Sequence, residues 1–270
     1  MTVPVERSVL VETSVLVETL APGVMQIRID RPERMNALGV ATVEQLLAAC
    51  GAVANARVVL LRGTGRAFCA GADLKERADM GAPERLAHNR AINAAANALE
   101  ALPMPTIAVL NGLALGGGLE IALACDLRFA ASSATMGLTE ARVGAIPGAG
   151  GTQRLPRLIG SARAMKMMLV GEPIDATTAE VWNLVQDVVV DAELDARVLQ
   201  YASLVASRSA SATRTLKRVV RTGIEESLVD GLQIERAAVT EILTSVDYAE
   251  GLRAFSERRA PVFVKEEMNQ

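Results

Sequence analysis

Aromatic residues and histidine are scarce in this chain, and each shortage excludes a class of function. Only 3% of the 270 residues are aromatic, so the chain is poorly supplied with stacking platforms for single-stranded nucleic acid. The single histidine, His88, excludes metal sites built from several imidazole ligands. Any Ser–His–Asp triad would also have to use that one residue, and no carboxylate or thiol is motif-spaced to it. We therefore expect no metal site and place His88 among packed or surface side chains.

Cysteine and net charge are also low, which bears on compartment and partners. The three cysteines (Cys50, Cys69 and Cys125) form no CxxC spacing, and their odd number argues against a disulfide framework. The chain carries a net charge of −3 and has a pI near 5.5, so net charge attracts no polyanion. A reducing, cytoplasmic location fits this composition.

No segment predicts a membrane anchor or a secretory signal. The longest stretch without charge lies between Glu100 and Glu120, but Pro103, Pro105 and a run of three glycines interrupt it. The first twelve residues carry both acidic and basic side chains and no uninterrupted apolar core. We expect no membrane partner.

Hydrophobic periodicity predicts an α/β protein. Strands are expected at 24–29, 57–61 and 106–110, and helices lie between them. The apolar helix positions recur at i, i+3, i+4 and i+7: Val43, Leu46, Leu47 and Cys50 in one helix, and Ile92, Ala95, Ala96 and Leu99 in the next. Beyond Asp191 only helices are expected, at 193–208, 212–223, 230–244 and 248–258. This alternation followed by helices predicts an α/β core with a helical appendage.

A perfect duplication stands near the start of the chain. The hexapeptide SVLVET occupies residues 8–13 and again residues 14–19, so either copy would present the same side chains to the same face of a sheet. The second copy keeps the short connection of residues 20–22 to the strand at 24–29. We predict that residues 14–19 form the strand, whereas residues 8–13 are a surplus extension, disordered or laid along an edge.

Two glycine-bearing turns are candidate anion receptors. Gly116, Gly117 and Gly118 precede a helix, whose first N–H groups lack partners within the helix. Residues 70–72 supply a second turn of this kind. Two backbone donors could grip one carbonyl oxygen, but glycine-rich turns are also common packing devices. Spacing alone does not decide between a receptor for a carbonyl oxygen and a packing device. Taken alone, Glu140 would be a solvated acid in a loop.

Several motifs in a fixed order resemble the crotonase superfamily, specifically the enoyl-CoA hydratases. They are RPERMNAL at 31–38, FCAGADLKE at 68–76, ALGGGLE at 114–120, ACDLR at 124–128, PGAGGTQRLPR at 147–157 and EGLRAFSERRAPVF at 250–263. The sequences of these motifs are most similar to those of the methylglutaconyl-CoA hydratases. The resemblance implies an α/β crotonase-like fold, a spiral of ββα turns with a C-terminal helical trimerisation region. Residues 1–13 would be an extension, 14–200 the catalytic core and 201–270 the helical assembly region.

The resemblance also implies roles for individual residues. Glu120 and Glu140 match the two catalytic carboxylates, and the backbone N–H groups of Ala72 and Gly117 match the oxyanion hole. The remaining matches concern coenzyme A: Ala70, Asp73, Leu74 and Lys75 along the CoA moiety, Arg34 and Ala37 near its nucleotide end, and Phe255 and Arg258 reaching a neighbouring subunit's site. No cation for a carboxylate at the far end of an acyl group is identifiable from the sequence.

The implied activity is the addition of water across the 2,3 double bond of a 2-enoyl-CoA thioester, in fatty-acid or branched-chain acyl-CoA breakdown. Coenzyme A would enter as part of the substrate, no further cofactor is expected, and the assembly would be a homotrimer or a dimer of trimers. One alternative is an enoyl-CoA isomerase that uses a single carboxylate. Another is an RNA- or protein-binding homologue with weak catalysis.

RNA binding in the nearest branch uses a lysine-rich segment on the first long helix. Here that helix carries no lysine over residues 44–50, so nucleic acid is not an expected partner. A basic stripe on a later helix (Arg214, Lys217, Arg218 and Arg221) is predicted to be a solvated or intersubunit face.

Overall fold

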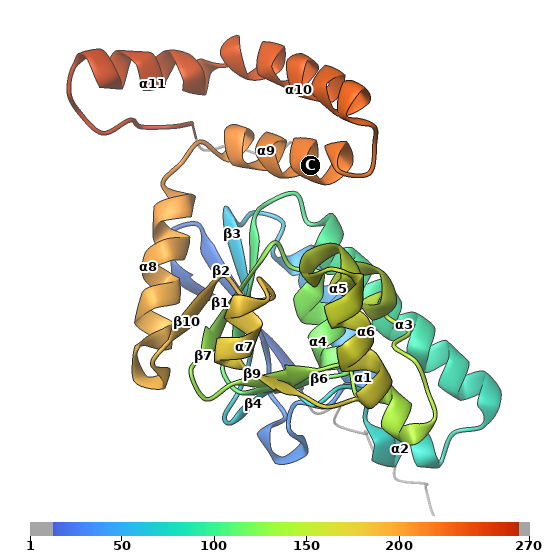
Figure 1. The fold of residues 1–270 in the computed structure, drawn as a ribbon. Helices are drawn as coiled ribbons and strands as arrows, with labels where there is room; N and C mark the ends of the chain where they lie inside the picture. The colour runs from blue at the N-terminus through green and yellow to red at the C-terminus, as the bar shows by residue number, and fades with distance from the viewer. Residues whose placement is uncertain (1–12, 265–270) are drawn as a thin grey trace, which may run out of the picture.

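The computed structural model describes residues 13–264, which form two β-sheets covered by helices (Figure 1). The larger sheet has the order β1-β2-β3-β5-β7-β10. Its strands are β1 (Val15–Ala21), β2 (Val24–Ile29), β3 (Val58–Gly63), β5 (Thr106–Leu110), β7 (Leu127–Ala131) and β10 (Asp187–Val189). Only β1 runs antiparallel to its neighbour, and the other pairs are parallel.

The smaller sheet has the order β4-β6-β8-β9 and positions the candidate site. Its strands are β4 (Ala67–Cys69), β6 (Leu113–Leu115), β8 (Thr135–Gly137) and β9 (Ile174–Asp175), of which the first three are mutually parallel. Each of β3, β5 and β7 in the large sheet is followed directly by β4, β6 or β8 in the small one. A helical segment then returns the chain, so the expected spiral of ββα turns is present.

The helices of the body follow these strand pairs. They are α1 (Val40–Ala52), α2 (Leu74–Ala78), α3 (Ala82–Ala101), α4 (Gly117–Leu123), α5 (Gly151–Ile159), α6 (Ser161–Val170) and α7 (Ala176–Val181), with 3-10 turns η1 (Pro32–Arg34), η2 (Glu140–Val143) and η3 (Asp191–Glu193). Among residues 13–264, no helix has both the length and the apolar character that a bilayer crossing requires.

The core lies between the large sheet and its covering helices. Strand β5 is buried at every position, as expected for a parallel strand that is covered on both faces. All four apolar positions predicted for α3 are buried, which confirms that stripe. The stripe predicted for α1 is wrong at Leu47, which is 44% exposed, because α1 turns the small Ala49 toward the core instead.

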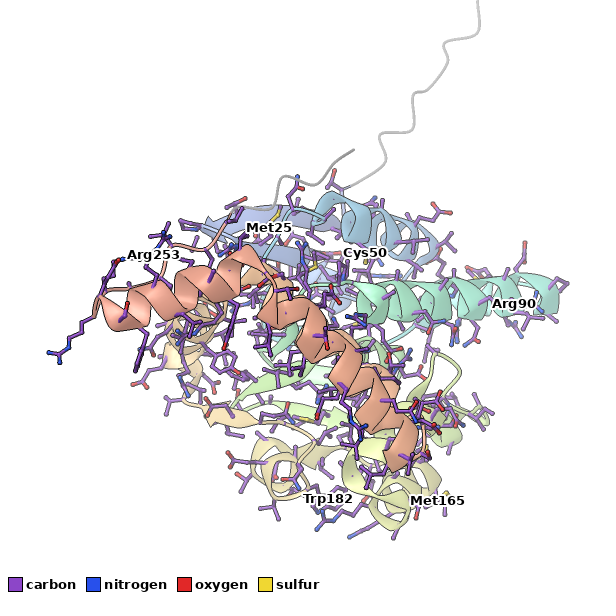
Figure 2. All side chains as sticks on the ribbon, turned by 90° about the horizontal axis from the view of Figure 1, so that it is seen from above. Met25, Cys50, Arg90, Met165, Trp182 and Arg253 are labelled. Carbon is purple, nitrogen blue, oxygen red and sulfur yellow. The ribbon has the colours of Figure 1, made fainter. Side chains whose placement is uncertain are left out.

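Four helices form the C-terminal part, as predicted within a few residues. They are α8 (Leu194–Ala206), α9 (Ala210–Gly223), α10 (Leu228–Leu243) and α11 (Val246–Ser256). Helix α8 covers one face of the large sheet, and α9 lies over its upper edge in Figure 1. Helices α10 and α11 lie above α9 at the top of Figure 1, and Figure 2 labels Arg253 near the outer end of α11.

Two residues of the basic stripe on α9 do not form the solvated or intersubunit face that the sequence predicts. Lys217 Nζ lies 2.8 Å from Asp126 Oδ2 and donates to the carbonyl oxygen of Met104. Arg221 pairs with Asp126 and Glu100, each at 2.8 Å. These two cations therefore face the protein's own core instead of solvent or another subunit, because Asp126 and Glu100 leave two carboxylates under α9. We call this arrangement the α9 clamp.

The duplicated hexapeptide fills the edge strand with its second copy, which confirms the prediction. Ser14 anchors the start of β1: its backbone N–H donates to Gln45 Oε1 at 2.8 Å, and its hydroxyl lies 3.1 Å from Thr42 Oγ1. Glu18 pairs with Arg28 across the hairpin at 2.8 Å. Thr13 has no regular structure, and the rest of the first copy lies outside the described residues.

Deleting residues 2–13 should leave thermal stability nearly unchanged, since the contacts described for β1 begin at Ser14. Deleting residues 2–19 should remove the edge strand, expose Ile27 and Ile29 of β2, and lower the melting temperature by at least about 5 °C. Thermal unfolding of the two truncated proteins beside the full chain measures this. A shorter deletion that destabilises as much as the longer one would show that the first copy is the working strand.

Candidate active site

A cavity of about 430 Å³ opens where three neighbouring strands of the small sheet end. Strands β4, β6 and β8 lie side by side and parallel, so their carboxyl ends meet at one edge. The segments that follow them carry Ala72, Gly117 and Glu140, two or three residues beyond each strand. All three residues line this cavity together with Glu120, which places the predicted catalytic residues in one site. Ligand sites in parallel sheets commonly lie at this edge.

Two backbone amides, those of Ala72 and Gly117, lie close together in the lining of the cavity. Leu38 donates to Gly71 and accepts from Asp73, so the amide of Ala72 between them points away from this bridge. Gly117 is the first residue of α4, where amides lack partners within the helix. Neither amide has a hydrogen bond within the described residues. A Cβ built on Gly117 would lie 3.7 Å from the nitrogen of Ala72, so the two donors are close enough to share one acceptor.

The glycine run permits close approaches of the main chain at the cavity. Gly116 adopts a φ of +49°, and a Cβ there would lie 2.9 Å from Glu140 Oε1. A Cβ on Gly118 would lie 2.2 Å from the carbonyl oxygen of Cys69 at the end of β4. Gly118 therefore lets α4 approach β4, and this approach brings Gly117 beside Ala72. The packing interpretation is thus correct for Gly118, and Gly117 keeps an amide that is open to the cavity.

Glu120 is held from beneath by the loop before α5. Its Oε1 accepts hydrogen bonds from the amides of Ala149 at 2.7 Å and Gly151 at 2.8 Å. Burial raises the pKa of the Glu120 carboxyl, and the hydrogen bonds from Gly151 and Ala149 oppose this shift because they favour the charged form. The side chain is oriented by main chain and reaches the cavity in one defined position.

Glu140 lies opposite, at the start of η2, in a less satisfied setting. Its Oε2 is buried without a hydrogen-bond partner among the described residues. Burial raises the pKa of Glu140 to about 7; the neighbouring charge of Glu120 adds to this, whereas Arg77 opposes it. Two carboxyl groups in different settings, one supported by amides and one unsupported, can hold one proton between them.

Two of the residues expected to contact coenzyme A, Asp73 and Arg34, instead bind to other parts of the protein. Asp73 is 3% exposed and caps α2 by accepting from the amides of Lys75 and Glu76. It also pairs with Arg34 at 2.9 Å. Burial alone would raise the pKa of Asp73, but the Arg34 hydrogen bond and the cap outweigh it and lower the pKa. Asp73 and Arg34 therefore fix the loop that carries Ala72.

The other expected CoA residues divide between the cavity and the surface. Ala70 and Leu74 line the cavity, Ala37 is buried nearby and Lys75 is exposed at the start of α2. Phe255 is 86% exposed on α11, and neither it nor Arg258 lines the cavity.

Sequence reasoning missed four polar residues that line the cavity: Arg77, Asn89, Thr139 and Arg142. Arg77 is three residues beyond Leu74 on α2, so the two share a helix face, which is a signal the sequence offered. Asn89 comes from α3, and a Cβ on Gly148 would lie 2.5 Å from its Nδ2. Only the tertiary structure places Asn89 here.

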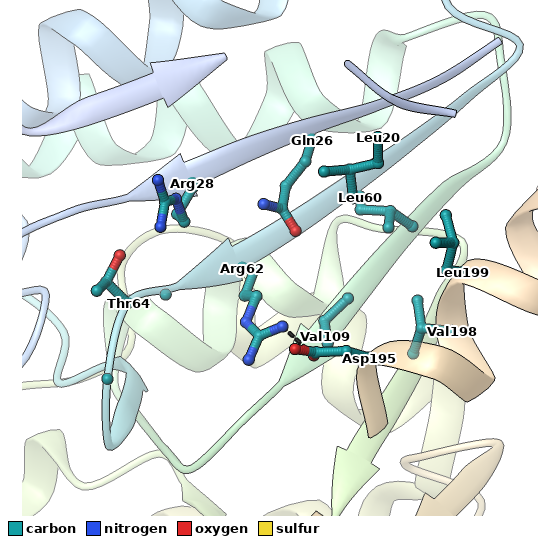
Figure 3. Close-up of a pocket in the computed structure, with 12 residues that line it drawn as sticks. Leu20, Gln26, Arg28, Leu60, Arg62, Thr64, Val109, Asp195, Val198 and Leu199 are labelled. Atoms are coloured by element: carbon teal, nitrogen blue, oxygen red, sulfur yellow. Dashed lines mark hydrogen bonds and ion pairs between the residues drawn. The ribbon is translucent and has the colours of Figure 1, made fainter. Parts of the chain in front are cut away.

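Two further cavities lack this chemistry. One of about 440 Å³ lies between the large sheet and α8, where Arg62 pairs with Asp195 beside Arg28 and Thr64 (Figure 3). Another of about 990 Å³ lies under α9, with a mainly apolar wall and the α9 clamp at its edge. In the described part of the chain, no group of three or more His, Cys, Asp or Glu side chains is placed to hold a metal ion.

Comparison with known proteins agrees with this architecture. The family model for enoyl-CoA hydratase/isomerase matches residues 19–266. The human mitochondrial enoyl-CoA hydratase domain-containing protein 2 is 41% identical over 250 residues, covering 90% of this chain and 86% of that protein. Human mitochondrial methylglutaconyl-CoA hydratase is 40% identical over 247 residues, covering 88% and 73%. A crystal structure of enoyl-CoA hydratase from Bacillus anthracis superposes with a TM-score of 0.92 at 42% identity, covering 94% of this chain and 100% of that one. The chain has the crotonase fold and belongs to the enoyl-CoA hydratase/isomerase family.

Proposed function

We propose that this protein is an enoyl-CoA hydratase, which adds water across the 2,3 double bond of a 2-enoyl-CoA thioester. The observation that carries the proposal is the pair Glu120 and Glu140 in one cavity with the free amides of Ala72 and Gly117. Hydration needs one group that takes a proton from water, a second that gives a proton to carbon, and donors for the charge on the thioester oxygen. The cavity supplies all three.

The two amides receive the thioester carbonyl oxygen. As water adds to C3, negative charge passes through C2 to this oxygen and gives it enolate character. Donors that are already aligned stabilise this charge without reorganisation, and one such donor typically contributes about 2.7–4 kcal/mol to the transition state. The positive end of the α4 dipole lies at Gly117 and acts in the same direction.

The two carboxyl groups divide the proton transfers. The amide hydrogen bonds from Ala149 and Gly151 favour the charged form of Glu120, which suits the base that removes a proton from water as its oxygen bonds to C3. Glu140, with a buried unpaired oxygen and a pKa raised to about 7 by burial, suits the acid that protonates C2. The hydroxyl and the hydrogen added to the double bond then sum to one water molecule.

The alternatives receive less support. An isomerase that moves the double bond needs only one carboxylate, whereas this cavity positions two. An RNA-binding role would draw on exposed cations, but Lys217 and Arg221 of the basic stripe pair with carboxylates of the core. Leu74 and Ala70 lining the cavity and Lys75 at its rim are consistent with a CoA ester that enters past α2.

Replacing either carboxylate should separate chemistry from binding. Glu120→Gln and Glu140→Gln keep the shape of the side chain but lose proton transfer, so each should lower kcat by at least about 10²-fold. The affinity for crotonyl-CoA, measured by calorimetry, should change little. The exposed Glu84→Gln on α3 is the matched control and should leave kcat unaltered. A Glu120 or Glu140 variant within a few-fold of wild type would contradict the mechanism.

The pH profile should report the shared proton. Because burial raises the pKa of Glu140 to about 7, the pair loses its last proton as the pH rises past that value, and kcat/KM should fall on the alkaline side. At low pH both groups are protonated, no base remains, and kcat/KM should fall again. Crotonyl-CoA hydration followed by ultraviolet absorbance measures this bell shape. A rate that stays constant from about pH 6 to about pH 9 would be inconsistent with a shared proton.

We also propose a homotrimer or a dimer of trimers, assembled through the C-terminal helices. Helices α10 and α11 present many large apolar side chains to solvent in the single chain, including Leu228 at 79%, Val246 at 69% and Phe255 at 86%. Contiguous apolar surface on a protein of this size is typical of an interface. Phe255 and Arg258 could then reach the cavity of a neighbouring subunit.

Removing residues 248–270 should therefore cost both assembly and activity. Sedimentation velocity should shift from the oligomer toward the monomer, and kcat/KM for crotonyl-CoA should fall by at least about tenfold. The single change Phe255→Ala tests the contribution of that side chain without removing the helix. A truncated chain that is fully active as a monomer would contradict the assembly.

A further inference from the structure

Two guanidinium groups converge on the C-terminal end of α4, the end that points away from the candidate site. Arg128 of β7 donates from Nη1 to the carbonyl oxygens of Cys125 at 2.9 Å and Ala122 at 3.4 Å. Arg221 of α9 donates from Nη2 to the carbonyl oxygen of Ala124 at 3.1 Å. These oxygens belong to the last turn of α4 and the two residues after it, where a helix has no donors of its own. Side chains from two distant segments therefore cap one short helix.

Arg128 is buried, and only uncharged oxygens receive its hydrogen bonds. The residue is 2% exposed, and burial lowers its pKa to about 10, so it is still charged at pH 7. Besides the oxygens at α4, its Nε donates to the Leu184 carbonyl at 2.7 Å and its Nη2 to Gln186 Oε1 at 3.3 Å. An apolar side chain of similar volume would fill this space at a lower cost. What Arg128 adds is geometry, because its planar fork holds α4, β7 and the segment before β10 in one arrangement.

The opposite end of α4 has no side chain that holds its main chain. Gly116, Gly117 and Gly118 follow one another there, and the N-cap residue Gly116 forms no side-chain hydrogen bond. Main-chain contacts remain: the Gly116 amide donates to the Gly137 carbonyl at 2.9 Å, and Gly118 lies against the carbonyl oxygen of Cys69. They fix how near α4 lies to the small sheet, but glycine permits many backbone angles. The arginine side chains that bind the main chain of α4 do so at its C-terminal end.

A displacement of the capped end would reach the cavity, because α4 is only seven residues long. At 1.5 Å per residue, a helix of this length spans about 10 Å. Gly117, whose amide is a proposed donor to the thioester oxygen, is the first residue of α4, and Glu120 lies in the same first turn. A misplacement of about 1 Å at reacting groups can lower a rate by about 10²-fold.

The α9 clamp consists of two cations with different contacts. Arg221 pairs with Asp126 and Glu100, each at 2.8 Å, in addition to capping α4. Lys217 pairs with Asp126 and donates to the carbonyl oxygen of Met104, and within the described residues it forms no hydrogen bond to α4. Lys217 therefore only docks α9 on the body, whereas Arg221 both docks α9 and caps α4. The two residues allow docking and capping to be tested separately.

We propose that Arg128 and Arg221 position the oxyanion hole by holding the C-terminal end of α4. The two groups thereby set where the Gly117 amide and the carboxylate of Glu120 lie in the cavity. Neither arginine lines the cavity, so both are positioning residues that act through α4. This inference rests on the proposed hydratase activity and makes α9, the first helix after α8, part of the support of the site.

Kinetics of three α9 variants test the cap. Arg221→Met should lower kcat for crotonyl-CoA about tenfold and change KM by less than about twofold, because the substrate still binds while donor and base are misplaced. Lys217→Met removes the other cation of the clamp but leaves the cap on Ala124, so it should keep kcat. Arg218→Met removes an exposed cation of the same helix, which pairs with Glu241 at 3.1 Å, and should also keep kcat. Thermal unfolding and sedimentation velocity compare the fold and assembly of the variants.

An infrared probe reads the oxyanion hole without turnover. Butyryl-CoA has no double bond to hydrate, and ¹³C in its thioester carbonyl gives a band that moves to lower wavenumber as hydrogen bonds to the oxygen strengthen. Wild-type protein saturated with this ligand should show the shift. Arg221→Met and Arg128→Lys, which keeps the charge but loses the planar fork, should show a smaller shift. Lys217→Met should match wild type, whereas a purely stabilising role of the arginines would leave the shift unchanged in all variants.

Arg221→Met decides the inference, since its side chain is partly exposed and the decision does not depend on whether Arg128→Lys folds. An unchanged kcat or an unchanged carbonyl shift in Arg221→Met would overturn it. Equal losses in Arg221→Met and Lys217→Met would assign the effect to the docking of α9 and overturn it as well.

Failure of the hydratase activity would look different. A folded wild-type protein that shifts the carbonyl band of butyryl-CoA but hydrates no 2-enoyl-CoA would refute the hydratase activity, and the band in Arg221→Met would still decide the positioning. A wild-type protein that binds butyryl-CoA without any shift would refute the oxyanion hole and this inference with it.

Discussion

Parallel pairing of β4, β6 and β8 is the constraint on which the site depends. The pairs Cys69–Ala114 and Leu115–Gly137 fix the register of three very short strands. A shift of one residue would turn each following segment to the other face of the sheet. Short strands hold such a register weakly, and Gly118 adds the close approach of α4 to Cys69 that reinforces it. The amides of Ala72 and Gly117 and the carboxylate of Glu140 come together because each residue follows one of these three strands, whose carboxyl ends lie at the same edge of the sheet.

Electrostatics in the cavity follow from this geometry. Burial raises the pKa of both Glu120 and Glu140, but only Glu120 receives hydrogen bonds from main-chain amides, so the two carboxyl groups differ in what they can do. Arg77 opposes the rise at Glu140 and is itself left without an anionic partner. The site therefore combines two carboxyl groups in unequal settings with the guanidinium of Arg77.

The α9 clamp performs a different task at the opposite end of the body. Lys217 and Arg221 share Asp126, and Arg221 also reaches Glu100 on α3. Lys217 is largely buried there, so these are partly desolvated pairs that are costly to break singly. The clamp holds α9 on the body, and α10 and α11 follow α9 in the chain and lie above it in Figure 1.

Local sequence patterns were sufficient to predict most helices and strands, because periodicity and turn residues act within a few positions. It determined the strand at 24–29, the strand at 106–110, the buried stripe of α3 and the working copy of SVLVET. Motif resemblance supplied the family, and it also named Glu120 and Glu140, which the structure brings into one cavity. Only the tertiary structure decided that Leu47 faces outward, that Lys217 and Arg221 turn inward to Asp126, and that Asn89 enters the cavity. Each of these depends on contacts between segments far apart in the chain, whose meeting is set by sheet order and helix packing and leaves no periodic trace in the residues themselves.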